Sequence, residues 1–176
     1  EFRVEETPAS VILSGADFTY EYDKRTGLFS RMYYHGREYL DRPMELNIWR
    51  APTDNDRYRK LEWKRARYDQ AYARAYDTRV CQAGASVRII SHLSLAAPSV
   101  QRMLDGEALW TVDGTGRIRV SLQMQQNPEF PELPRFGLRL FLKKTLDQVT
   151  YYGMGPYESY RDKHQASCHG RYQAPV

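Results

Sequence analysis

Three consecutive polar residues, Asp54, Asn55 and Asp56, are the first group in this sequence that could do chemistry. They follow the run NIWRAPT, in which Pro52 is expected to stop strand pairing because proline has no N–H to donate. Their oxygens could accept backbone N–H groups in a turn or cap a helix that follows. We favour this structural interpretation over a ligand site.

A metal site and a pair of catalytic carboxylates are the alternatives for the same residues. A calcium loop needs a glycine at its sixth position and a glutamate at its twelfth, and the sequence has neither. Glycoside hydrolysis needs two carboxyl groups about 5 to 9 Å apart on either side of one bond. Asp54 and Asp56 could be close enough, but no pattern places them across a cleft. We therefore predict no metal ligand and no catalytic residue here.

A second polar group lies in the stretch YYGMGPYESYRDKHQAS, residues 151–167. Gly153 and Gly155 allow close backbone approach or a positive φ, and Pro156 is expected to end a strand. The side chains from Glu158 onwards would suit sugar recognition, although an ion pair of Glu158 with a cation of the same run is the more common arrangement. The stretch is not a phosphate loop, because no Lys-Ser/Thr pair follows the glycines.

Other functional classes have little support. The histidines show no metal spacing, and no G-x-S-x-G motif is present. Cys81 and Cys168 stand far apart without a C-x-x-C pattern, so a zinc site is not expected and one distant disulfide stays open. The 26 basic and 22 acidic residues are mixed along the chain, which argues against nucleic-acid binding. No apolar run is long enough to cross a bilayer, so no membrane partner is expected.

The elements that must position these residues are mostly strands, because apolar and polar residues alternate along much of the chain. We expect a hairpin meander over residues 11–40 and later hairpins that turn at Gly84 and at the Asp-Gly pair 113–114. One segment, residues 59–72, looks helical, with Leu61 on its apolar face. About ten strands and one short helix predict an all-β fold, a large antiparallel β-sandwich with a helical insertion, over the single domain 1–176.

Three motifs together resemble one known family. The stretches NIWRAPTDND, LPRFGLRL and YYGMGPYESYRDK are similar to the carboxy-terminal domain of the large bacterial β-galactosidases of glycoside hydrolase family two, also called the β-galactosidase small chain. The matching residues are Arg50, Ala51, Pro52, Asp54, Asn55 and Asp56 in the first motif, Pro134, Arg135 and Gly137 in the second, and Gly153, Gly155, Pro156, Glu158, Tyr160 and Asp162 in the third.

The resemblance implies a supersandwich similar to galactose mutarotase and an accessory role beside a catalytic (β/α)8 barrel. That barrel would carry the catalytic glutamates and most of the magnesium ligands, so the chain itself would hold no cofactor and no catalytic residue. Its partners would be the catalytic domains and the galactoside substrate. The implied residues are Asp54, Asn55, Asp56 and Glu158 at the rim of the sugar site, and Trp49, Arg50, Pro52, Arg135, Gly153, Gly155, Pro156, Tyr160 and Asp162 as structural motif residues.

The resemblance also implies that the family domain continues past the third motif. We therefore expect an incomplete sandwich, truncated at its C-terminus, whose uncovered sheet edges favour self-association. The compartment of the parent protein, cytoplasmic or periplasmic, is left open by the sequence.

Two other functions remain as alternatives. A free-standing carbohydrate-binding module would use exposed aromatic residues such as Trp49, Trp63 and Tyr157 as stacking platforms. Exposed tryptophans would favour this module, and buried ones would favour the accessory scaffold. A mutarotase-like enzyme, suggested by fold kinship alone, would need His92 or His164 to face a sugar together with Glu158.

Overall fold

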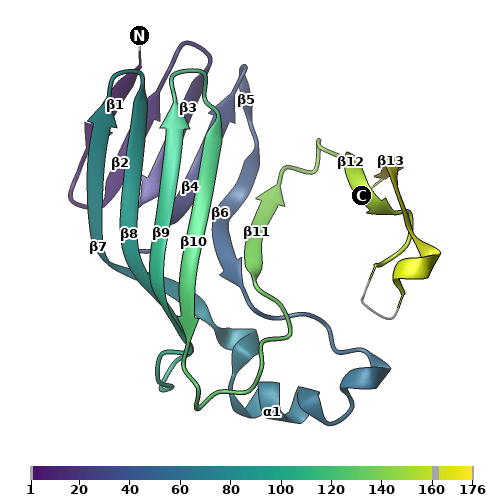
Figure 1. Cartoon of the computed structure of the whole chain (residues 1–176). Coiled ribbons are helices and arrows are strands. Elements are labelled where there is room, and N and C mark those ends of the chain that lie inside the picture. The colour runs from purple at the N-terminus through teal and green to yellow at the C-terminus, as the bar shows by residue number, and fades with distance from the viewer. Residues whose placement is uncertain (1, 160–162, 176) are drawn as a thin grey trace. The chain divides into compact units, whose positions relative to one another are not determined.

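The computed structural model describes residues 2–159 and 163–175 of the chain. These residues form two compact units, Glu1–Phe141 and Leu142–Val176. Strands make up most of both units, and a short helical region follows the sixth strand of the first unit (Figure 1). No helix among the described residues is long and apolar enough to span a membrane.

The first sheet contains five antiparallel strands in the order of the sequence. They are β1 (Arg3–Glu6), β2 (Ser10–Ser14), β3 (Phe18–Asp23), β4 (Leu28–Tyr34) and β5 (Arg37–Glu38). Buried residues alternate with solvent-facing ones along β2 and β3, as expected when one face of a sheet covers a core. The predicted meander over residues 11–40 is confirmed, and the sheet gains β1 as an additional edge strand.

The second sheet contains four long antiparallel strands in the order β10-β9-β8-β7. These are β7 (Tyr72–Ala83), β8 (Ser86–Ala96), β9 (Leu104–Asp113) and β10 (Ile118–Gln126). The predicted turn at Gly84 joins β7 to β8, and Gly84 has the positive φ of 59° that favours glycine there.

The β9–β10 turn lies where the sequence predicts it. The position whose backbone conformation favours glycine, however, is Gly116, two residues after Gly114 of the Asp-Gly pair. Asp113 Oδ1 accepts the backbone N–H groups of Thr115 and Arg117 at 2.9 and 3.2 Å. The residue with positive φ is Gly116, at 84°, and not Gly114. This turn is therefore a four-residue connection closed by the Asp113 carboxylate.

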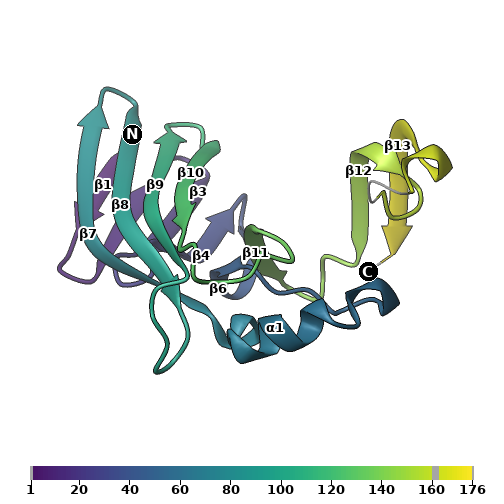
Figure 2. The same ribbon diagram turned by 60° about the horizontal axis from the view of Figure 1, so that its bottom comes forward.

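The two sheets face each other, as Figure 1 and Figure 2 show, and bury an aromatic core between them. Trp110 of β9 donates its indole N–H to the carbonyl of Gly27 at 3.1 Å, and its ring meets that of Phe29 edge-on at 5.1 Å. Tyr22 of β3 pairs its hydroxyl with that of buried Ser91 on β8 at 2.7 Å. Polar groups within the core are thus paired from one sheet to the other, which avoids the cost of burying them unsatisfied. The predicted all-β sandwich is confirmed.

The helical region is shorter than predicted. In place of one helix over residues 59–72, the chain forms α1 (Arg59–Arg65) and a separate 3-10 turn, η2 (Tyr68–Gln70). Arg67 has a left-handed conformation with φ of 58°, which ends the regular helix. Leu61, expected on the apolar face, is 53% exposed, so that part of the prediction is wrong.

Strand β6 (Leu40–Asn47) leads into this region and pairs with β11 (Gly137–Leu142). The sequence predicts that Pro52 stops strand pairing, but β6 already ends at Asn47. The amide of Asn47 explains the earlier end, because it donates to the carbonyl of Trp49 at 2.8 Å and accepts the N–H of Trp49 at 3.2 Å. The Asn47 side chain thereby makes the two backbone hydrogen bonds that a neighbouring strand would otherwise make.

The second unit is a hairpin-like pair of strands, β12 (Gln148–Gly155) and β13 (Cys168–Pro175), with a 3-10 turn η3 (His164–Ala166) in the connection. β12 ends immediately before Pro156, as predicted. Gly155 is needed for close approach, because a Cβ there would lie 2.5 Å from the hydroxyl oxygen of Tyr151.

Candidate functional site

The Asp-Asn-Asp segment is held by an ion pair between Arg50 and Asp56. Arg50 donates Nη1 to Asp56 Oδ2 at 2.6 Å and Nη2 to Oδ1 at 2.8 Å. Thr53 donates its backbone N–H and its hydroxyl to the same Oδ2 at 2.8 and 3.0 Å. Both charged side chains are largely withdrawn from solvent. The carboxylate of Asp56 is therefore engaged by groups of its own loop, as the turn-and-cap interpretation expects.

These contacts decide the charge of Asp56. Burial acts to raise the pKa of Asp56, but the hydrogen bonds from Arg50 and Thr53 outweigh it and hold the pKa below its usual value. A carboxylate with a lowered pKa stays ionised at neutral pH, so it is unsuited to give up a proton as a general acid. Asp56 works as an anchor of the loop.

The other two residues of the segment face outward. Asp54 and Asn55 begin the 3-10 turn η1 (Asp54–Asp56), and both are exposed. The turn is closed by backbone hydrogen bonds from Asp56 to Thr53 at 3.0 Å and from Arg57 to Asp54 at 3.3 Å. The loop thus presents one carboxylate and one amide to solvent from a rigid base.

A proline-rich connection, residues 130–134, lies against the helical region and accepts its side-chain donors. Arg50 Nε donates to the carbonyl of Pro134 at 3.2 Å, and Trp63 Nε1 donates to that of Glu132 at 3.0 Å. The hydroxyl of Tyr68 donates to the carbonyl of Pro131 at 2.5 Å. These three bonds attach the loop, helix α1 and turn η2 to the segment before β11. The sequence did not reveal them, because the donors and acceptors lie more than sixty positions apart.

The two tryptophans of this region are not open stacking platforms. Trp63 is buried, and Trp49 is half-buried and meets it edge-on with ring centroids 6.4 Å apart. Lys64 Nζ lies 4.9 Å from the Trp49 ring centroid, and the Arg50 guanidinium lies 5.3 Å from that of Trp63. The exposure test therefore favours a scaffold over a carbohydrate-binding module built on these rings.

The second polar stretch also forms local contacts. Glu158 pairs with Lys163, in agreement with the ion-pair interpretation, and Ser159 Oγ lies 2.8 Å from His164 Nδ1. Tyr160 and Asp162 lie outside the described residues. Tyr157 is 70% exposed beside this pair.

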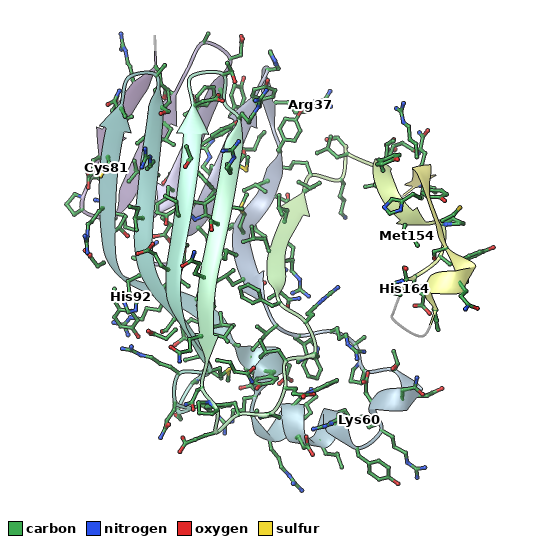
Figure 3. All side chains as sticks on the ribbon, viewed as in Figure 1. Arg37, Lys60, Cys81, His92, Met154 and His164 are labelled. Carbon is green, nitrogen blue, oxygen red and sulfur yellow. The ribbon has the colours of Figure 1, made fainter. Side chains whose placement is uncertain are left out.

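Of the two histidines suggested for a mutarotase-like site, His92, on β8, has its Nε2 3.0 Å from Asp105 Oδ2 of β9. Figure 3 labels His92, which belongs to the first unit, and His164, which belongs to the second. Among residues 2–159 and 163–175, no three His, Cys, Asp or Glu side chains are grouped so that they could hold a metal ion. Cys81 and Cys168 are both free thiols.

Comparison with known proteins decides the family. The family model described as beta galactosidase small chain matches residues 14–176. The chain belongs to the β-galactosidase small chain family. This small-chain domain is 37% identical over 171 residues to a β-galactosidase of Actinobacillus pleuropneumoniae and 33% identical over 164 residues to one of Staphylococcus xylosus. It is 38% identical over 168 residues to a β-galactosidase of Lactobacillus delbrueckii subsp. bulgaricus.

The small-chain domain spans only a small part of these relatives. The three matches cover 97%, 93% and 93% of this chain but 17%, 16% and 16% of the relatives. The family assignment confirms the resemblance drawn from the three sequence motifs. The ion pair between Arg50 and Asp56 gives the first of those motifs a structural basis, because its two charged ends meet in space.

Proposed function

We propose that the chain is a non-catalytic accessory domain of an enzyme that hydrolyses terminal β-D-galactosides, and that its Asp-Asn-Asp loop forms part of the rim of the sugar site. The observation that carries the proposal is the anchored loop, in which Arg50 and Asp56 fix the base while Asp54 and Asn55 are exposed. A rigidly held loop with an outward carboxylate and amide can contact sugar hydroxyls with little loss of entropy on binding.

The partners in this proposal are the catalytic domains of the parent enzyme and its galactoside substrate. Glu158 is assigned to the same rim by its motif, and no metal or cofactor is assigned to this chain. The matches to full-length β-galactosidases support the assignment of the partners, because each places this domain within a much longer chain.

A domain exchange tests the proposal. The matching segment of the Actinobacillus pleuropneumoniae β-galactosidase is replaced by this chain, and hydrolysis of a chromogenic β-galactoside is followed. We expect an active chimera, whereas the isolated chain should not exceed a buffer blank. Turnover by the isolated chain would contradict the non-catalytic role.

The loop itself is tested within the chimera by Asn55→Ala. We expect KM to rise several-fold while kcat changes little, the pattern expected when ground-state and transition-state binding are lost equally. The matched control is Glu107→Ala, which deletes an exposed carboxylate of β9. This variant should leave KM unchanged. An unchanged KM in Asn55→Ala, with the chimera folded and active, would remove the loop from the rim.

A further inference from the structure

The outer face of the second sheet carries a cluster of polar side chains around Tyr76, a residue outside the three sequence motifs. Tyr76 lies at a bulge of β7, where the pairing with β8 shifts between Ala75 and Asp77. A bulge can re-aim a side chain away from the regular alternation of a strand. The Tyr76 side chain is 48% exposed, so its phenol is open to reagents in solution.

The neighbours of Tyr76 lie on the side of the sheet that is turned away from the core. Arg74, Ser94 and Asp105 occupy directly paired positions on β7, β8 and β9. Directly paired residues of neighbouring strands point to the same side of a sheet. Leu93, next to Ser94 in the strand, belongs to the buried core, so Ser94 and the residues paired with it point to the opposite side.

The Tyr76 side chain has contacts with one hydroxyl donor and two positive charges. The hydroxyl of Ser94 donates to the phenol oxygen at 3.3 Å. The guanidinium carbon of Arg102 lies 4.5 Å from the centroid of the Tyr76 ring, and that of Arg74 lies 5.4 Å from it. Although Ser94 points away from the core, it is buried, so the surrounding side chains cover its hydroxyl.

Asp105 holds two further members of the cluster. Its Oδ1 accepts a hydrogen bond from Arg102 Nη1 at 3.0 Å, and its Oδ2 lies 3.0 Å from His92 Nε2. The imidazole of His92 in turn has its centroid 6.1 Å from that of the Tyr76 ring. One carboxylate thus fixes a guanidinium and an imidazole beside the phenol.

The contacts of Tyr76 favour its ionised form. A hydrogen bond donated to the phenolate oxygen and a nearby positive charge both stabilise the phenolate. The hydrogen bond from Ser94 and the charges of Arg102 and Arg74 outweigh the effect of burial and hold the pKa of Tyr76 below its usual value. The phenolate is the nucleophilic form of tyrosine, so these contacts enlarge the fraction that can attack an electrophile.

We propose that Tyr76 is a nucleophilic modification site whose phenol oxygen accepts activated sulfonyl or phosphoryl groups. These are tetrahedral electrophiles with acceptor oxygens, to which Arg74 and Arg102 can donate while the phenol oxygen attacks. With a sulfonyl fluoride, the phenol oxygen forms a bond to sulfur and the sulfur–fluorine bond breaks. Fluoride leaves with the bonding electrons, and the phenolic proton passes to solvent. None of these residues belongs to the Asp-Asn-Asp loop, so the site does not rest on the rim function.

Labelling with benzenesulfonyl fluoride, followed by trypsin digestion and mass spectrometry, tests the site. Tyr76 is the only tyrosine of the tryptic peptide 75–79, and Tyr72, the internal standard on the same strand, lies in the peptide 68–74. Exposure alone would favour Tyr72, which is 56% exposed. We expect Tyr76 to be labelled several-fold faster than Tyr72. Equal or slower labelling of Tyr76 would overturn the proposal.

Two variants test the cause of the reactivity. Arg102→Met and Ser94→Ala each remove one contact of Tyr76 and should slow its labelling several-fold, with the labelling of Tyr72 unchanged. The Arg102 side chain is half exposed, so Arg102→Met should fold as the unaltered chain does. A slower rate in either variant supports the assignment, and undiminished labelling in both would overturn it. The matched control is Arg88→Met, which removes an exposed arginine of β8 and should leave the rate unchanged. An equal loss in this control would also overturn the assignment, because a general charge effect would then explain the rate.

Discussion

Arg50 and Asp56 face each other through two parallel hydrogen bonds of 2.6 and 2.8 Å, although six positions separate them in the chain. A bidentate pair fixes the relative orientation of its two planar groups as well as their distance. The same guanidinium also reaches the carbonyl of Pro134 at 3.2 Å. The exposed loop between the two residues is therefore closed at its base and attached to a distant segment by one arginine.

Removal of Asp56 should destabilise the fold. In Asp56→Ala, Arg50 and the N–H of Thr53 lose their acceptor in a half-buried place, so we expect the free energy of unfolding to fall by about 1–3 kcal/mol. Urea unfolding of the two proteins measures the change. Asp54→Ala, at an exposed neighbour, should stay within about 0.5 kcal/mol, and EDTA should change neither protein. Equal midpoints for Asp56→Ala and the unaltered chain would show that the loop does not need its anchor.

The Asp56 carboxylate should make the free energy of unfolding depend on pH in the acidic range. Since the folded state lowers the pKa of Asp56, the unfolded chain binds its proton first as the pH falls. Its contribution is complete above the unfolded value of about 3.9 and is lost as the pH falls through the lower folded value. Urea midpoints measured across this acidic range should fall less steeply in Asp56→Asn. Parallel curves for the two proteins would argue against a perturbed carboxylate.

Alkaline pH should destabilise the chain through its buried tyrosines. Burial raises the pKa of Tyr20 and of Tyr68 to about 12. In the unfolded chain these phenols ionise near pH 10, so their contribution is complete below about pH 10 and is lost as the pH rises towards the folded values. Tyr68→Phe should show a shallower loss of urea midpoint between about pH 10 and 12. An identical slope in the variant would contradict the assignment.

Self-association is expected through strand β11. Within the described residues β11 hydrogen-bonds to β6 alone, and Leu140 is 47% exposed. An open strand edge with apolar side chains favours pairing with another chain. Sedimentation velocity should show larger species as the concentration rises, and Leu140→Lys should reduce them. Leu61→Lys, at an exposed leucine on α1, is the control and should have no effect. A strictly monomeric profile at high concentration would rule out this edge as an interface.

The hairpins were predictable because their signals are local. Alternating burial in β2 and β3 and the glycine at position 84 can each be read from a few adjacent residues. The helix was overestimated for the opposite reason. Leu61 has helical spacing to its neighbours, yet it is exposed, and the left-handed Arg67 follows the end of the short helix. No local pattern in the sequence marks that break.

The site was predictable in part. The sequence placed the oxygens of Asp56 in a turn, and the Asp56 carboxylate does accept the N–H and the hydroxyl of Thr53 there. β1 was missed, since its polar residues form a strand only through their pairing with β2.

The bonds between the helical region and the proline-rich connection are asymmetric in their tolerance of sequence change. The donors are the side chains of Arg50, Trp63 and Tyr68, whereas the acceptors are main-chain carbonyls. Every amino acid has a carbonyl, so residues 131–134 can vary in type without removing an acceptor, as long as the backbone path is kept. Replacement of a donor removes the bond itself. Random mutagenesis of this contact should therefore recover folded variants mainly on the acceptor side.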